Sequence, residues 1–165
     1  MAKRVFFSFH DDPDNWRVAQ VRNMGVVEDD APVSDNNWET VRKRDDAAIE
    51  KWIKGQLNDR SCTVVLVGTN TAGRKWINYE IKETWNSGKG LVGIHIHNLK
   101  DVNGNQSLKG GNPFNGFTIG ENKISMASVV KLYDPPFTTS TYVYDHIKEN
   151  IAAWVDEAIA IRNRY

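Results

Sequence analysis

The run Ser61-Cys62-Thr63-Val64-Val65-Leu66-Val67 decides the fold class of this 165-residue chain. It is rich in β-branched and apolar residues, which is typical of a central parallel strand covered by helices on both faces. A loop of small residues, Gly68 to Gly73, follows the run and leads into a segment with helical spacing, Trp76 to Trp85. A buried strand followed by a loop and an amphipathic helix predicts an α/β fold.

The alternation of strand and helix extends over the rest of the chain. The further predicted strands are 4–9, 26–27, 91–97 and 129–133, and the further predicted helices are 12–24, 45–57 and 142–164. With right-handed crossovers, five such strands predict an open parallel sheet in the order 2-1-3-4-5. Asp12 is the predicted N-cap of the first helix and Pro13 its first residue. No repeat or linker divides the chain, so residues 1–165 are predicted to form a single domain.

The composition argues against nucleic-acid and membrane partners. Lys and Arg number 21 and Asp and Glu also number 21, so there is no basic excess. No stretch approaches the roughly 18 apolar residues of a transmembrane helix, and the apolar run near the N-terminus is too short for a signal peptide. The single Cys62 lies within an apolar strand and cannot form an internal disulfide. We therefore expect a soluble, cytoplasmic protein.

Glu80 interrupts the apolar face of the predicted helix 76–85. Ile77, Ile81 and Trp85 form one stripe at helical spacing, and Glu80 lies on the edge of that stripe. The pattern leaves two interpretations open. The more common one is a border carboxylate paired with a Lys or Arg, and the other is an acid held at the rim of a cleft.

The predicted sheet order points to one place for a ligand. In such sheets ligands bind beyond the carboxyl ends of the strands where the winding reverses, here strands 4–9 and 61–67. The helix that carries Glu80 follows the second of these strands. The residues that leave the two strand ends are Ser8, Phe9, His10 and Asp11, and Gly68, Thr69 and Asn70.

Several common cofactor and catalytic motifs are missing from the sequence. No Gly-x-Gly-x-x-Gly follows the first strand and no P-loop occurs. His95 and His97 share one strand face, but the spacing places no third ligand for a metal. No Ser or Cys has the context of a hydrolase nucleophile. We predict neither a metal nor a cofactor.

Three segments carry a resemblance to a known family. They are Lys3-Arg4-Val5-Phe6-Phe7-Ser8-Phe9, Asp14-Asn15-Trp16-Arg17-Val18-Ala19-Gln20-Val21-Arg22-Asn23 and Arg74-Lys75-Trp76-Ile77-Asn78-Tyr79-Glu80-Ile81-Lys82. The chain resembles the TIR-like proteins of bacteria, in particular the TIR subunit of the Thoeris anti-phage defence system. The resemblance implies a flavodoxin-like fold and cleavage of NAD at the nicotinamide–ribose bond. It commonly also implies cyclisation to an ADP-ribose isomer that activates a partner effector.

The resemblance assigns the catalytic role to Glu80. The classical pattern is Trp-Cys-x-x-Glu, and this chain departs from it at Ile77, between Trp76 and Glu80. One carboxylate can suffice for this reaction, because nicotinamide in NAD is already cationic and leaves as a neutral molecule. Ordinary glycosidases need a second carboxyl group to protonate a poor leaving group. NAD is thus expected as the substrate.

The predicted NAD-binding residues surround Glu80 and the two strand ends. Phe9 could stack on nicotinamide or adenine, although a plain core aromatic is the equal alternative. Asn112 and Asn115 could donate amide hydrogen bonds to ribose, although their spacing also suits two turns. The predicted set is Ser8, Phe9, His10, Asp11, Trp16, Thr69, Trp76 and Asn112.

Two other functions remain open at this stage. One is a non-catalytic TIR-like module that assembles through its tryptophans and the long polar loop Glu28–Asn37, which could equally be a lid. The other is a phosphate-receiving regulator, for which the required Asp at the end of strand 61–67 is missing. The TIR interpretation adds a signal-sensing effector as a partner, and a homo-oligomer in which a neighbour's loop closes over NAD.

Overall fold

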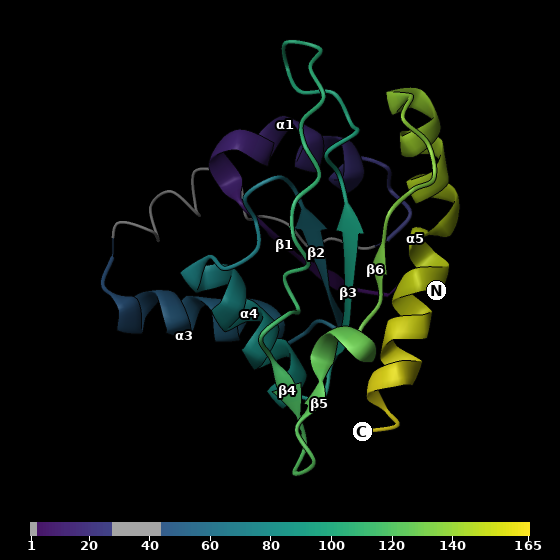
Figure 1. The fold of residues 1–165 in the computed structure, drawn as a ribbon. Coiled ribbons are helices and arrows are strands. Elements are labelled where there is room, and N and C mark those ends of the chain that lie inside the picture. Colours follow the sequence, from purple (N-terminus) through teal and green to yellow (C-terminus); the bar gives the residue numbers. More distant parts are fainter. Residues whose placement is uncertain (1–2, 28–43) are drawn as a thin grey trace.

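A parallel sheet of four strands forms the centre of the protein (Figure 1). The structure is a computed structural model that describes residues 3–27 and 44–165, so the predicted loop Glu28–Asn37 lies outside the described residues. The strands pair in the order β1-β2-β3-β6, where β1 is Val5–Phe9, β2 is Cys62–Val67, β3 is Gly90–His95 and β6 is Leu132–Tyr133. All three pairings are parallel. The strands therefore end at one edge of the sheet, which we term the carboxyl edge.

The Val-rich run forms β2, as the sequence predicts. All six residues of β2 are buried, because β1 and β3 flank it and helices cover both faces. Side chains alternate between the faces of a strand. Val64 and Leu66 belong to one core cluster, and Val65 and Val67 belong to another.

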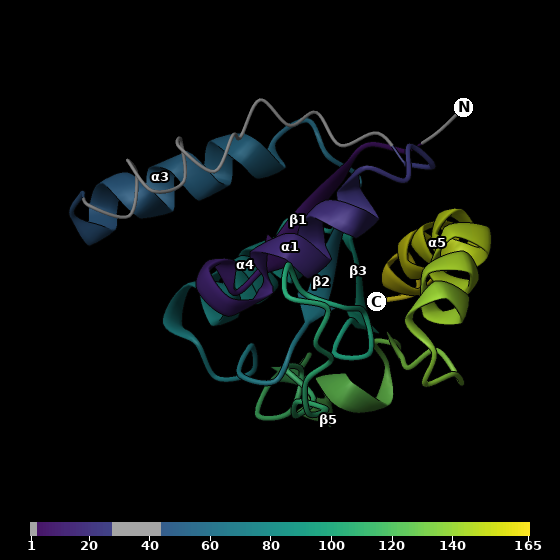
Figure 2. The ribbon, with the colours of Figure 1, turned by 90° about the horizontal axis from the view of Figure 1, so that it is seen from above.

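Helices cover both faces of the sheet and complete three layers (Figure 2). The cluster on one face includes residues of α1 and α5, and the cluster on the other face includes residues of α4. A third cluster joins α3 to Phe6 of β1. None of the helices in the described ranges is both long and apolar enough to cross a membrane. The helices are α1 (Asp11–Arg22), α3 (Asp46–Leu57), α4 (Lys75–Asn86) and α5 (Ser140–Arg162).

The helix starts follow local chemistry with one correction. Asp45 caps α3, because its carboxylate accepts a hydrogen bond from the Ala48 N–H at 2.8 Å. The predicted start of α1, with Asp12 as N-cap and Pro13 as first residue, is wrong by two residues. The helix begins at Asp11, and His10 takes the N-cap position with extended backbone angles.

The predicted strand at 26–27 is wrong. Val26 and Val27 form a bend and lie partly buried against the core cluster shared by α1 and α5. Two residues offer few backbone hydrogen bonds to a sheet, and packing against the core buries their side chains without strand pairing. The described sheet therefore has four strands rather than five, and the remaining predicted strands keep their order.

The segment between β3 and α5 is less regular than the strand pattern predicts. A small antiparallel hairpin forms from β4 (Thr118–Ile119) and β5 (Ile124–Ser125), in a region where the sequence predicts no strand. A 3-10 helix, η1 (Met126–Ser128), follows the hairpin. The predicted strand at 129–133 is shortened to β6, because the Val129 and Val130 N–H groups donate to the Met126 carbonyl.

Candidate active site

Glu80 lies on the inward face of α4 instead of at its border. Its side chain is only 4% exposed, and it belongs to the same buried face of the helix as Ile77 and Ile81. Its Oε2 has no hydrogen-bond partner in residues 3–27 and 44–165. The common alternative, a carboxylate paired with Lys or Arg, is not found among the ion pairs of the described residues.

Ser8 of β1 is the polar neighbour of Glu80. It is 1% exposed and lies on the face of the sheet that α4 covers, at the position paired with Val65. Ser8 Oγ is also buried without a hydrogen-bond partner among the described residues, so its approach to Glu80 does not reach hydrogen-bond geometry. Two polar atoms with unused hydrogen-bonding capacity thus lie together near the carboxyl edge. Such atoms in a folded protein indicate a site for water or a ligand.

The surroundings of Glu80 favour its neutral form. Burial raises the pKa of Glu80 to about 8, and the Ser8 hydroxyl opposes this by favouring the ionised form. A positive charge nearby strongly stabilises the ionised form of such a carboxyl group, because the attraction offsets the free-energy cost of ionisation in a site without water. The site is therefore suited to a cationic ligand that carries hydroxyl groups.

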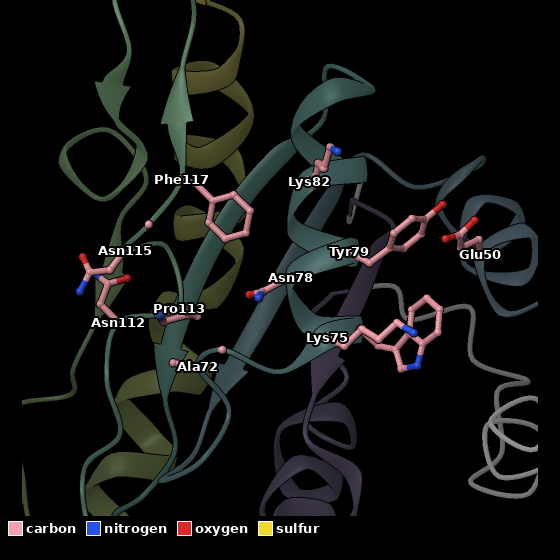
Figure 3. Close-up of a pocket in the computed structure, with 13 residues that line it drawn as sticks. Glu50, Ala72, Lys75, Asn78, Tyr79, Lys82, Asn112, Pro113, Asn115 and Phe117 are labelled. Atoms are coloured by element: carbon pink, nitrogen blue, oxygen red, sulfur yellow. The ribbon is translucent and has the colours of Figure 1, made fainter. Parts of the chain in front are cut away.

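A pocket of about 680 Å³ opens on the outward side of α4 (Figure 3). Trp76 and Tyr79 line it from α4, and Asn112 and Asn115 line it from the loop after β3. Figure 3 shows the loop residues on one side of the pocket and Tyr79 on the other. Glu80 is not among the lining residues, because its side chain is on the inward face of the same helix.

The structure brings some predicted residues together. Ser8 lies beside Glu80, and Trp76 and Asn112 line the same pocket. The Trp76 ring packs edge-to-face on Tyr79 with 5.7 Å between centroids. Asn112 also forms one of its two predicted turns, since its Oδ1 accepts a hydrogen bond from the Phe114 N–H at 2.8 Å.

The other predicted residues have different surroundings. Phe9 packs against the core cluster of α1 and α5, on the face opposite Ser8. Trp16 is 54% exposed on α1. The Thr69 hydroxyl donates a hydrogen bond to the Leu108 carbonyl, so Thr69 connects the loop after β2 to the loop after β3. His10 is partly buried before α1, and the backbone of Asp11 begins that helix.

Asp14 is a polar residue of the carboxyl edge that the sequence analysis missed. It is 2% exposed, and its Oδ2 has no hydrogen-bond partner among the described residues. In the sequence its spacing from Arg17, three residues later, suggests only an ordinary ion pair on a helix surface. Asp14 Oδ1 and Arg17 Nη1 are indeed 3.6 Å apart. Only the packing of α1 against the loop after β2 reveals that the group is buried, and no sequence pattern carries that information.

His95 and His97 are buried at the end of β3 and just beyond it. Their rings pack edge-to-face with 5.5 Å between centroids, and the Nδ1 atom of each has no partner in the described part of the chain. Burial lowers the pKa of His95 to about 4, which keeps that ring neutral near pH 7, and burial also lowers the pKa of His97. Across residues 3–27 and 44–165, no group of three His, Cys, Asp or Glu side chains could hold a metal ion.

Comparison with known proteins shows which family the chain belongs to. Residues 6–101, which include β2, α4, β3 and all of β1 except Val5, match the model of the Thoeris protein ThsB, TIR-like domain. The chain belongs to this family. The match includes Ser8, Asp14 and Glu80 but ends before Asn112, so the TIR-like resemblance of the sequence is confirmed for the part that carries Glu80.

A curated relative of this ThsB TIR-like domain comes from Bacillus cereus (strain MSX-D12). It is named "Putative cyclic ADP-D-ribose synthase ThsB1" and is 45% identical over 119 residues, which is 69% of the present chain. The match spans 62% of that relative's own length. The similarity therefore covers most of this TIR-like domain but only part of the relative.

Proposed function

We propose that this TIR-like domain cleaves NAD between nicotinamide and ribose and closes the remaining ADP-ribose into a cyclic product. The observation that carries the proposal is Glu80, a buried carboxyl group with an unpartnered oxygen near the carboxyl edge. Membership of the ThsB family supports it, as does the name of the Bacillus cereus relative, which describes a cyclic ADP-D-ribose synthase.

Glu80 would stabilise the positive charge that develops on the ribose. As the C1′–N bond lengthens, its electron pair moves to the pyridinium ring and the sugar becomes oxocarbenium-like. A carboxylate in a dry site lowers the energy of that state strongly. The substrate's positive charge and its ribose hydroxyl groups favour ionised Glu80, and so oppose the burial that raises its pKa to about 8 in the unliganded protein.

Ser8 would orient the Glu80 carboxylate. Its hydroxyl favours the ionised form of Glu80, and it has a free donor for either the carboxylate or the substrate. Trp76 and Asn112, which line the pocket on the other side of α4, would contact more distant parts of NAD. Phe9, His10, Asp11, Trp16 and Thr69 stay predicted members of the binding surface.

Cyclisation requires that an internal nucleophile competes successfully with water. A group of the same NAD molecule has a large advantage in effective concentration once the molecule is held in a bent conformation. We propose that a second copy of the domain closes over the bound NAD and excludes water. The cyclic product would then act in the cytoplasm as an anti-phage signal for an effector protein, without a cofactor, nucleic acid or membrane as partner.

A non-catalytic assembly module is the second candidate. The observation that favours it is the 54% exposure of Trp16 on α1, since large exposed aromatic side chains are enriched in protein interfaces. In that case the domain would bind partners without consuming NAD.

Incubation with NAD separates the two functions. The wild type, Glu80→Gln and Glu83→Gln would be incubated at high concentration, alone and with extract of phage-infected cells, and released nicotinamide measured by chromatography. Glu83 is the matched control because it lies on the same helix outside the buried face. We expect release by the wild type and Glu83→Gln but not by Glu80→Gln. No release by any of them under either condition would favour the assembly module.

A further inference from the structure

A second buried carboxyl group, that of Asp14, lies at the carboxyl edge. Asp14 is in α1, which follows β1, and its side chain rests on Gly68, the residue after β2. A Cβ added to Gly68 would lie only 2.1 Å from Asp14 Oδ2. Figure 1 shows α1 beside the tips of β2 and β3, and Figure 2 shows it across β1 and β2 when the molecule is viewed from above.

Asp14 and Glu80 approach the carboxyl edge from different helices. α1 contributes to the core cluster on one face of the sheet and α4 to the cluster on the other. Each helix thus brings one buried carboxyl group with an unpartnered oxygen to the region where β1 and β2 end. A molecule bound across this edge would meet a carboxyl group on either side.

The fold accounts for only one of the two oxygens of Asp14. Oδ1 lies 3.6 Å from Arg17 Nη1. The other nitrogens of Arg17 are used elsewhere, because Nε donates to the Leu99 carbonyl at 2.8 Å and Nη2 to the Asn105 carbonyl at 2.9 Å. Oδ2 has no partner among the described residues, although a buried carboxylate oxygen without one is costly. The Thr71 hydroxyl lies near enough to favour ionised Asp14, but Oδ2 has no hydrogen bond of normal geometry, so a purely structural role leaves it unexplained.

Neighbouring groups only partly offset the burial of Asp14. Burial raises its pKa, while Arg17, the Thr71 hydroxyl and Arg74 favour the ionised form. A carboxylate whose pKa is raised above its ordinary value binds a proton more readily, which is the property that a general base needs.

We propose that Asp14 binds the hydroxyl group that attacks the ribose of NAD and accepts the proton of that hydroxyl. The inference rests on the proposed NAD-cleaving function. The C1′–N bond breaks and its electron pair passes to nicotinamide, which leaves as a neutral molecule. A bond forms between C1′ and the hydroxyl oxygen, and the hydroxyl proton passes to Asp14 Oδ2. Glu80 stabilises the charge on the sugar, and Asp14 removes the proton.

The attacking hydroxyl has two sources with the same chemistry. A ribose hydroxyl of the same NAD molecule gives a cyclic product, and water gives linear ADP-ribose. An adenine ring nitrogen has no proton to lose, so cyclisation through that nitrogen does not need Asp14. The products formed by an Asp14 variant therefore identify the group that Asp14 serves.

The test compares Asp14→Asn with Asp101→Asn. Asparagine keeps the shape of the side chain beside Gly68 but cannot act as a base. Asp101 is the matched control, because its Oδ2 lies 3.9 Å from Arg17 Nη2 but its side chain is partly exposed on a loop. We expect Asp14→Asn to release nicotinamide on the order of 100-fold more slowly than the wild type, and Asp101→Asn to match the wild type. Mass spectrometry shows whether the cyclic product, ADP-ribose or both decrease.

Azide provides a readout that a structural role would not change. Azide is an anion that attacks carbon without losing a proton, so it replaces a nucleophile that needs a base. We expect sodium azide to restore nicotinamide release by Asp14→Asn with formation of ADP-ribosyl azide. It should not restore release by Glu80→Gln, because the charge on the sugar remains unstabilised in that variant.

Several results would overturn the inference. Wild-type rates in Asp14→Asn, or a slow variant that azide does not accelerate, would remove Asp14 from the reaction. If Asp14→Asn does not fold by circular dichroism, Asp14→Ser takes its place, and failure of both to fold would assign the carboxyl group to structure. Absence of nicotinamide release by the wild type would overturn the proposed function itself, together with this inference.

Discussion

Glu80 Oε2 on α4 and Ser8 Oγ on β1 lie near each other inside the protein, and neither atom has a hydrogen-bond partner among the described residues. Glu80 is 4% exposed and Ser8 is 1% exposed, so bulk water does not compensate for the missing bonds. These two unpaired polar atoms therefore destabilise the folded state. Proteins retain such features where a ligand supplies the missing partners.

The pH dependence of stability should report the burial of Glu80. Burial raises its pKa from the ordinary 4.5 to about 8, so between these values the folded state holds a proton that the unfolded state has lost. The folded state binds more protons there, and stability falls as pH rises through this range. Glu80→Gln lacks this penalty, so we expect it to match the wild type near pH 4.5 and to be more stable near pH 8.5.

Urea unfolding of both proteins at several pH values measures this difference. We expect it to reach a few kcal/mol at most, since one pKa unit corresponds to about 1.4 kcal/mol. A constant difference between the two proteins across the range would show that Glu80 is solvated in solution.

Ser8→Ala should shift the pH profile of the proposed reaction. The Ser8 hydroxyl favours the ionised form of Glu80, so its removal raises the pKa of Glu80 further. If ionised Glu80 is the active form, the rising limb of kcat/KM against pH moves to higher pH. Nicotinamide release from pH 6 to 9 by the wild type and Ser8→Ala would measure the shift, and an unmoved limb would separate Ser8 from Glu80.

Gly110→Ala should destabilise the protein, whereas Gly111→Ala should not. A Cβ on Gly110 would lie 2.1 Å from the Gly68 carbonyl oxygen, and backbone atoms cannot move away cheaply. On Gly111 the nearest atom would be the Ala72 Cβ at 3.9 Å, an ordinary contact. We expect a loss of about 1–3 kcal/mol for Gly110→Ala, measured by urea unfolding. Equal stability of the two variants would mean that the two loops do not touch in solution.

His95 should contribute to acid sensitivity. Burial lowers the pKa of His95 from the ordinary 6.5 to about 4, so in this range the unfolded state binds a proton that the folded state does not. Stability therefore falls as pH decreases from 6.5 to 4. His95→Asn should show a shallower loss over this interval, by about 1–3 kcal/mol at pH 4. Parallel curves for the two proteins in urea titrations would contradict this.

The sequence predicts those parts of the fold in which local pattern and tertiary packing agree. β2 and α4 are examples, because the Val-rich run has one stable arrangement between two helical layers and the stripe of Ile77, Ile81 and Trp85 has one inward face. The same periodicity places Glu80 only at the edge of that stripe. Its position on the inward face and its burial beside Ser8 depend on how closely α4 packs on β1.

Other features depend on contacts between distant parts of the chain. Val26 and Val27 have strand-forming side chains, yet contact with the core outweighs this preference. The hairpin at 118–125 and the 3-10 helix after it are too short to have a period. Asp14 is buried only because Gly68 leaves room for its carboxyl group.

The guanidinium group of Arg17 holds α1 to a segment more than eighty residues later through the carbonyl oxygens of Leu99 and Asn105. Every amino acid carries a carbonyl oxygen, so this attachment does not depend on which side chains the segment bears. A substitution at an exposed position of the segment, such as Val102 with 68% exposure, can therefore leave the path of the backbone unchanged. One arginine thus fixes this surface segment independently of the side chains that the segment exposes to solvent.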